Sequence, residues 1–253
     1  MVLDPAAILL DGRRALVTGA AAGIGRATTL ALARFGAAVA VCDRDAGGLE
    51  TLAAEVELSH VDAIDVRDGD AVAGWVGGAV SAMGGLDIVV NNAGGGFAAA
   101  FVGLSDRAQT ALVDENFTSV TNVVRVAVPH LGPGSAIVNV TSVEAHRAAP
   151  GFAVYAAMKA AVANLTKSLA LELGERGIRV TCVAPDDIPT PGVGSLDGVR
   201  TPLGGPGKAD DVAAAVVFLV SDMAAFVTGT TLHVDGGTHA AGGWRLEEGS
   251  WTL

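Results

Sequence analysis

Short runs of apolar residues alternate along the chain with longer stretches of helix length. Seven runs have the length of a strand, and they begin at Ala15, Ala38, Val61, Leu86, Ala136, Ile178 and Thr231. They are apolar throughout rather than at every second residue, which is typical of strands covered on both faces. Residues 25–35 and 155–173 are examples of the helical stretches between them. This alternation predicts βαβ units with right-handed crossovers and a mostly parallel sheet.

No linker, low-complexity tract or internal repeat interrupts the alternation, so we expect one domain over residues 1–253. Two segments depart from it. Residues 186–209 are rich in Pro and Gly, and we expect them to form a substrate loop. Residues 238–253 form a C-terminal tail that holds Trp244 and Trp251, two of the three tryptophans.

The composition favours a globular protein with a large core, since 51% of the residues are hydrophobic and 17% are charged. No uncharged apolar run approaches the roughly 20 residues that span a bilayer. The N-terminal segment lacks the basic region of a secretory signal. We therefore expect a soluble, cytoplasmic protein that does not bind membranes. The net charge of -11 repels phosphate backbones, so nucleic-acid binding is not expected.

The cysteines and histidines do not form a recognisable metal motif. Cys42 and Cys182 have no CxxC spacing and lie in strand-like runs, where buried thiols are expected. The five histidines are not paired at the spacing of metal ligands, and we expect no metal site.

A glycine-rich turn joins the first strand-like run to the first helix. Gly19, Gly23 and Gly25 let the backbone turn tightly, and the helix then directs free N–H groups and a positive dipole end at a pyrophosphate. Asp43 follows at the end of the second strand, eighteen residues after Gly25. Such an acid accepts a hydrogen bond from the ribose 2′-hydroxyl of NAD and repels a 2′-phosphate. Glycine also occurs in tight turns for packing alone, but this context favours dinucleotide binding.

The only tyrosine, Tyr155, stands one helical turn before Lys159. Residues four apart lie on one face of a helix, so both side chains can reach the same cleft. A free phenol has a pKa near 10, and a neighbouring ammonium lowers it. We therefore predict that Tyr155 exchanges a proton with an alcohol or carbonyl oxygen. Taken alone, the pair could also be a surface cation–π contact.

The order and spacing of these motifs resemble the short-chain dehydrogenase/reductase family, in its shorter, single-domain branch. The glycine turn reads Gly-x-x-x-Gly-x-Gly, and the "NNAG" stretch begins at Asn91. Asn116, Ser142 and the Tyr155–Lys159 pair follow in the order of the family. The resemblance covers nearly the whole chain.

The resemblance implies a Rossmann-like, doubly wound α/β fold. Its seven-stranded sheet would have the order 3-2-1-4-5-6-7, with helices on both faces. Cys42 on strand 2 and Cys182 on strand 6 would then lie four strands apart. That separation is too large for a disulfide within one chain.

The resemblance also implies roles for individual residues. Ser142 would hold the substrate oxygen near Tyr155, Lys159 would grip the nicotinamide ribose, and Asn116 would hold a water that links the lysine to solvent. Among the cofactor-binding positions, Asp65 and Val66 would flank the adenine, Asn92 and Gly94 would line the adenosine ribose, and Thr190 would meet the carboxamide. The implied cofactor-binding residues are Gly19, Ala22, Gly23, Ile24, Gly25, Asp43, Arg44, Asp65, Val66, Asn92, Ala93, Gly94, Tyr155, Lys159, Pro185, Ile188 and Thr190.

Charge near the ribose favours NAD as the cofactor over NADP. Relatives that prefer NADP usually carry Arg or Lys within the glycine turn or just after the second strand. Here the interior of the turn is Ala20, Ala21 and Ala22, and Arg44 comes only after Asp43.

The activity that the resemblance implies is an NAD(P)-dependent oxidation of CH–OH donors or the reverse, between a secondary alcohol and its ketone. The small-molecule substrate is left open between a hydroxysteroid-like or alicyclic alcohol and a 3-oxoacyl thioester. The thioester is less favoured, because the acidic surface offers no obvious binding site for a phosphopantetheine carrier or coenzyme A. One alternative is a catalytically inactive dinucleotide-sensing or scaffold protein, although such proteins typically lack the tyrosine or the lysine. Another is a sugar-nucleotide epimerase or dehydratase, whose chains are longer.

A homodimer or homotetramer is expected, as in the family. The helix at residues 155–173 is apolar on more than one face, so one face can pack on the sheet and another on a second copy. The tail tryptophans are candidates to seal such an interface or to cover the cleft of a neighbour.

The substrate pocket departs from the family pattern at one position. Asp186 follows Pro185 where relatives have glycine. A benign turn residue is favoured there over a carboxylate directed at the nicotinamide or the substrate. Glu144 and His146 are unusual polar residues beside a pocket expected to be apolar, and they are either pocket residues or solvated. The other expected pocket residues are Gly95, Gly96, Phe97, Val143 and Phe152.

Overall fold

The computed structural model describes residues 4–191, 193, 196, 199, 201–243, 245–247 and 250–252. The main strands are β1 (Arg14–Thr18), β2 (Ala38–Asp43), β3 (His60–Ala63), β4 (Ile88–Asn91), β5 (Ala136–Val140), β6 (Arg179–Pro185) and β7 (Thr231–Val234). The helices are α1 (Gly23–Arg34), α2 (Ala46–Ala53), α3 (Gly69–Met83), α4 (Asp106–Val113), α5 (Ser119–Ala127), α6 (Ala153–Gly174), α7 (Ala209–Val220) and α8 (Thr238–Ala241).

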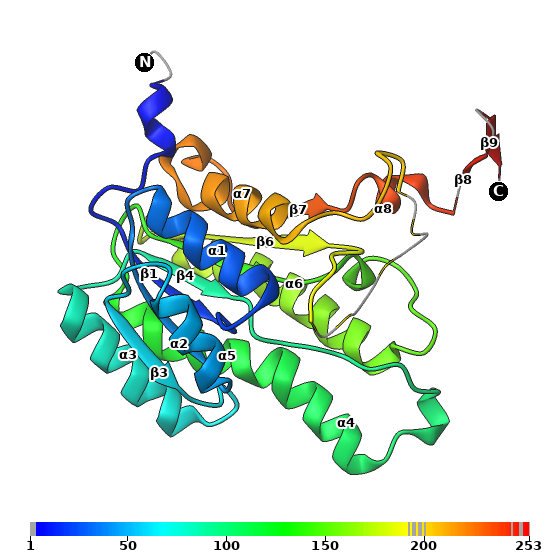
Figure 1. The fold of residues 1–253 in the computed structure, drawn as a ribbon, viewed down its shortest axis with the longest axis horizontal. Coiled ribbons are helices and arrows are strands. Elements are labelled where there is room, and N and C mark those ends of the chain that lie inside the picture. Colours follow the sequence, from blue (N-terminus) through cyan, green and yellow to red (C-terminus); the bar gives the residue numbers. More distant parts are fainter. Residues whose placement is uncertain are drawn as a thin grey trace.

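The seven main strands form one sheet in the order β3-β2-β1-β4-β5-β6-β7, with helices on both faces (Figure 1). Every neighbouring pair is parallel, so the predicted order is confirmed and the sheet is wholly rather than mostly parallel. The direction of strand succession reverses between β1 and β4. Sheets of this type bind ligands at that reversal, beyond the carboxyl ends of the strands.

The strand predicted from Val61 to Val66 is shorter than expected. It pairs only over His60–Ala63, and Asp65 and Val66 lie in the following loop. The Asp65 carboxylate accepts a hydrogen bond from the backbone N–H of Arg67 at 3.0 Å. Such a local turn competes with strand pairing and ends the strand. Consequently, Asp65 and Val66 reach the edge where the cleft opens.

Apolar residues on alternate positions of the central strands enter two separate cores. Val17 and Val41 pack with α1, α2 and α7 on one face of the sheet. Leu16 and Ala40 pack with α3, α5 and α6 on the other face. This double burial explains why the strands read as continuous apolar runs. Cys42 and Cys182 are both buried and free, as predicted.

A line of polar side chains crosses the buried centre of the sheet and ties α6 to it. Asn91 Nδ2 on β4 donates to Asn139 Oδ1 on β5 at 2.8 Å, and Asn139 Nδ2 donates to Thr166 Oγ1 on α6 at 2.8 Å. Thr166 Oγ1 in turn lies 3.0 Å from Cys182 Sγ on β6. Buried polar groups stay stable only when paired, so this line fixes how α6 sits on the sheet.

Parts of the two segments that depart from the alternation lie outside the described residues. In the predicted substrate loop these are residues 192, 194, 195, 197, 198 and 200, and in the tail they include Trp244. The backbone of β8 (Arg245–Glu247) and β9 (Ser250–Thr252) forms an antiparallel pair separate from the main sheet (Figure 1). The side chain of Trp251 is not among those described. Within the described part of the chain, no helix is both long and apolar enough to cross a membrane.

The polar line through the sheet can be tested by Asn139→Ala. We expect the free energy of unfolding to fall by about 2 to 4 kcal/mol, because the amide of Asn91 loses its partner in a buried site. Asn164→Ala is the matched control, since Asn164 is exposed on α6, and its effect should stay within about 0.5 kcal/mol. Urea unfolding measures both variants. Equal changes in the free energy of unfolding of the two variants would contradict a structural role for the hydrogen-bonded line.

Candidate active site

A cleft of about 790 Å3 opens at the carboxyl edge of the sheet, where β1, β2, β4, β5 and β6 end. Nearly all of the residues predicted to bind cofactor or substrate line it. These are Gly19, Ala22, Gly23, Ile24, Asp43, Arg44, Asp65, Val66, Asn92, Ala93, Gly94, Ser142, Tyr155, Lys159, Pro185, Ile188 and Thr190. Gly25 and Asn116 do not line the cleft but support its wall from behind.

The glycine turn has the close backbone contacts that a phosphate cradle requires. Gly19 and Gly23 adopt φ values of +66° and +56°. A Cβ on Gly25 would collide with the carbonyl oxygen of Gly19. Asn92 Nδ2 donates to the carbonyl oxygens of Thr18 and Gly19, each at 3.0 Å, and so holds the turn against β4.

No side-chain cap closes the N-terminus of α1, which begins at Gly23. Its first N–H groups therefore stay free for an anion, and the helix dipole favours negative charge there. Together with the cradle, this fits the pyrophosphate of a dinucleotide.

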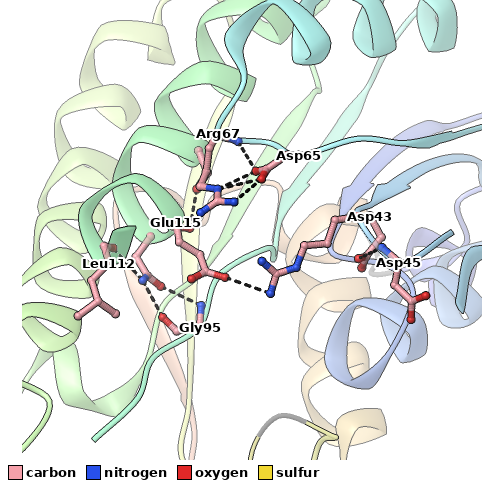
Figure 2. Close-up of polar contacts among 10 residues, drawn as sticks. Asp43, Asp45, Asp65, Arg67, Gly95, Leu112 and Glu115 are labelled. Carbon is pink, nitrogen blue, oxygen red and sulfur yellow. Dashed lines mark hydrogen bonds and ion pairs between the residues drawn. The ribbon is translucent and has the colours of Figure 1, made fainter. Parts of the chain in front are cut away.

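Several carboxylates, those of Asp43, Asp45, Asp65 and Glu115, lie near the ends of β2 and β3 and the turn before α5 (Figure 2). Asp43 Oδ2 accepts from the N–H of Ala21 and Asp43 Oδ1 from the N–H of Asp45, both at 3.0 Å. These bonds fix the Asp43 carboxylate at the end of β2, beside the glycine turn. Arg67 lies on Asp65 and lowers the pKa of that carboxyl through its hydrogen bond.

Two arginines near this end of the cleft, Arg26 and Arg44, contact other residues of the chain. Arg26 bonds to Gly48 O at 3.2 Å and to Glu55 at 2.8 Å, so it ties α1 to α2. Arg44 Nη2 lies 3.8 Å from Glu115 Oε1, and both residues line the cleft. The Arg44 side chain is 70% exposed, so this is a loose ion pair.

Asn116 lies in a π-helical turn, Asp114–Thr118, between α4 and α5. Its Nδ2 donates to Gly95 O at 2.7 Å and to Leu112 O at 3.0 Å, while its Oδ1 accepts from Gly95 N at 3.2 Å (Figure 2). A Cβ on Gly94 would come within 2.9 Å of Asn116 Oδ1 and 3.0 Å of Lys159 Nζ. These contacts hold residues 94–96, which form one wall of the cleft, close to Lys159.

Ser142, Tyr155 and Lys159 are brought together as predicted, from the end of β5 and the first turns of α6. Lys159 is only 5% exposed, and its Nζ donates to Val140 O at 3.1 Å. Nζ lies 5.6 Å from the centre of the Tyr155 ring. Gly96 packs on the same ring, since a Cβ there would come within 2.8 Å of it.

The expected fall in the pKa of Tyr155 is wrong for this arrangement. Burial raises the pKa of Tyr155 above 10, the charge of Glu144 raises it further, and a hydrogen bond with Ser142 opposes both. The ammonium lies over the ring and bonds to Val140. Burial also lowers the pKa of Lys159 to about 8. In the free protein, burial therefore works against formation of the phenolate.

The polar residues next to Ser142 form a network that the sequence did not predict. Arg147 Nη2 donates to Glu144 Oε1 at 2.8 Å and to Asp186 Oδ1 at 3.2 Å. Glu144 and Asp186 both line the cleft, and each forms an ion pair with Arg147. Burial raises the pKa of Asp186. No motif or spacing marks Arg147, because its partners come from different strand ends.

Three histidines that are far apart in sequence also meet. The rings of His233 and His239 stack with centroids 4.3 Å apart, and His146 lies 4.8 Å from His233. Among the residues that the structure describes, no three His, Cys, Asp or Glu side chains are arranged to hold a metal ion. His146 does not line the cleft, unlike Glu144 two residues before it.

Known proteins are similar to this chain over nearly its whole length. The model of a family described as Enoyl-(Acyl carrier protein) reductase matches residues 19–239. A 3-oxoacyl-(acyl-carrier-protein) reductase of Thermotoga maritima is 39% identical over 90% of this chain and 98% of its own. The D-erythrulose reductase of Gallus gallus is 38% identical over 89% of this chain and 95% of its own.

Solved structures agree with the fold. A short-chain dehydrogenase of Burkholderia cenocepacia in complex with NADP has a TM-score of 0.87 and 38% identity, covering 90% of this chain and 98% of that one. A 7α-hydroxysteroid dehydrogenase in complex with NADH and a 7-oxo bile acid has a TM-score of 0.89 and 30% identity, covering 94% of this chain and 98% of that one. The chain therefore belongs to the short-chain dehydrogenase/reductase family and is an oxidoreductase that acts on an alcohol or a carbonyl compound.

Proposed function

We propose that the protein transfers hydride between NAD(H) and a secondary alcohol or its ketone, with Tyr155 as general acid and base. The observation that carries this proposal is that Ser142, Tyr155 and Lys159 open into the same cleft as the glycine turn. The bound dinucleotide supplies or accepts the hydride, while the residues of the chain hold the substrate oxygen and move its proton.

Proton transfer in this site favours ketone reduction at neutral pH. A phenol whose pKa is raised keeps its proton and can donate it to a carbonyl oxygen that becomes negative. Lys159, protonated below about pH 8, adds positive charge to the same part of the cleft. Alcohol oxidation needs the phenolate instead, so its rate should increase with pH.

The charges at the adenosine end favour NAD over NADP as the cofactor. Asp43 places a fixed carboxylate beside the glycine turn, where it would accept from a ribose hydroxyl and repel a 2′-phosphate. Arg26 is bonded to Glu55 and Arg67 to Asp65, while Arg44 makes only a loose ion pair with Glu115. The solved structure of the Burkholderia relative contains NADP, and this describes the cofactor of that protein.

A catalytically inactive dinucleotide sensor or scaffold is the alternative. Such a protein has no use for a buried ammonium beside a buried phenol, because burying a charge costs free energy. The retention of both Tyr155 and Lys159 in the cleft supports the enzyme.

The variant Tyr155→Phe separates the two functions. We expect kcat for ketone reduction with NADH to fall about a hundred-fold or more, because the phenol supplies the proton. Binding of NADH, followed by its fluorescence, should be retained. Since Tyr155 is the only tyrosine, ultraviolet difference absorbance reports its ionisation directly, and no phenolate should form in the free enzyme below about pH 10. Unchanged turnover in the variant would refute the assigned role.

The cofactor preference is tested with Asp43→Asn. We expect the ratio of kcat/KM for NADPH to that for NADH to rise about tenfold or more, because the repulsion of a 2′-phosphate is removed. Asp45→Asn is the matched control, since Asp45 caps α2 and asparagine is an equally good cap. A wild-type enzyme that prefers NADPH would overturn the choice of NAD while leaving the reaction intact.

We also propose that the protein is a homodimer or homotetramer. Leu171, on the outer face of α6, is 82% exposed in the single chain, and Phe226 is fully exposed. Large exposed apolar side chains often mark interaction surfaces. Analytical ultracentrifugation should give a dimer or tetramer, with Leu171→Lys shifting the population to smaller species. A wild-type monomer at micromolar concentration would contradict the proposal.

A further inference from the structure

One wall of the cleft, next to the reacting groups, is acidic. Glu144 and Asp186 line it together with Ser142 and Tyr155, and Asp187 adds a third carboxylate. The two carboxylates come from different elements: Glu144 follows β5 and Asp186 follows β6. Among the described residues, Arg147 is the cation that joins Glu144 and Asp186, and Lys159 lines the cleft nearby.

Arg147 stands behind this wall and fixes the two carboxylates in place. Its Nη2 donates to Glu144 Oε1 at 2.8 Å and to both oxygens of Asp186 at 3.2 and 3.3 Å, and Arg147 itself does not line the cleft. Within the described residues, no hydrogen bond uses Glu144 Oε2. The Glu144 Oε2 oxygen can therefore accept a hydrogen bond from a ligand bound next to Ser142.

The carboxylates are close enough to the reacting phenol to act on a substrate held there. The charge of Glu144 raises the pKa of Tyr155, and Ser142 Oγ accepts from the backbone N–H of Glu144 at 3.2 Å. The Asp186 side chain is only 9% exposed. Its partners within the described residues are Arg147 and Thr238, and a bound molecule can add another.

The cleft also has an aromatic lining. Phe152 meets Tyr155 edge to face at 6.3 Å between ring centres, and Phe97 lines the cleft near Gly96. Both phenylalanines are exposed enough to be contacted. Carboxylates that accept from hydroxyls, combined with aromatic faces that pack on C–H groups, suit a molecule with many hydroxyls on a carbon frame.

Resting on the proposed function, we propose that the substrate is a neutral, polyhydroxylated ketone or the matching polyol, such as a ketose or a cyclic polyol. Glu144 and Asp186 accept hydrogen bonds from hydroxyls on the carbons beside the reacting one. They repel substrates that carry a carboxylate or a phosphate. Arg147 is a positioning residue that acts through both of them.

Four ketones with the same four-carbon reacting frame test this assignment, each with saturating NADH and, in parallel, NADPH. Erythrulose has hydroxyls on the other three carbons, butan-2-one has none, and 3-oxobutanoate carries a charge. The N-acetylcysteamine thioester of 3-oxobutanoate represents a neutral acyl thioester. We expect kcat/KM for erythrulose to exceed that for butan-2-one by about tenfold or more, and 3-oxobutanoate to be the poorest.

Charge-removing variants identify the residues responsible. In Glu144→Gln and Asp186→Asn, the ratio of kcat/KM for erythrulose to that for butan-2-one should fall about tenfold. In both variants, the ratio of kcat/KM for 3-oxobutanoate to kcat/KM for butan-2-one should rise. Glu172→Gln, on the exposed side of α6, is the matched control and should change neither ratio.

For the positioning role, Arg147→Met should raise KM for erythrulose more than it lowers kcat, and Arg147→Lys should restore part of the loss. An unspecific loss of structure would instead lower kcat for all four ketones alike. The inference is overturned if the thioester is the best substrate, or if wild type and variants show the same ratios. If the wild-type enzyme reduces none of the four ketones but reduces an alicyclic ketone such as cyclohexanone, the inference fails and the proposed function stands. If it reduces no ketone of either kind, the proposed function fails as well.

Discussion

The buried ammonium of Lys159 is the group around which the cleft is organised. Its Nζ bonds to Val140 O at the end of β5, and burial lowers its pKa to about 8. A buried charge is costly unless its surroundings hold polar groups in place. The polar line through Asn139 and Thr166 anchors α6 on the sheet, and Gly94 leaves the space that the ammonium occupies.

The parallel sheet explains why the other functional groups meet at the same place. All seven main strands point the same way, so the glycine turn, Asp43, Asn92, Ser142 and Asp186 all follow strand ends at one edge. A protein with a net charge of -11 does not attract an anionic dinucleotide through its overall field. Backbone N–H groups at the start of α1 supply the local attraction instead.

Acidic residues line both ends of the cleft, and Arg44, Arg67 and Arg147 each lie next to one of them. Arg44 lies against Glu115 at the adenosine end, and Arg147 lies against Glu144 and Asp186 at the substrate end. Carboxylates at both ends of the cleft repel anionic groups. The proposed use of NAD and the proposed uncharged, hydroxylated substrate would both follow from this repulsion.

The sequence by itself determined the fold and the central chemistry. Strands covered on both faces are apolar throughout, and the glycines, Asp43 and the Tyr155–Lys159 pair stand at spacings fixed by local backbone geometry. The tertiary structure decided the features that depend on distant segments. Arg147 joins the ends of β5 and β6, and burial raises rather than lowers the pKa of Tyr155. Spacing along the chain reports neighbours on one element, whereas burial and contacts between strand ends arise only when the whole sheet is assembled.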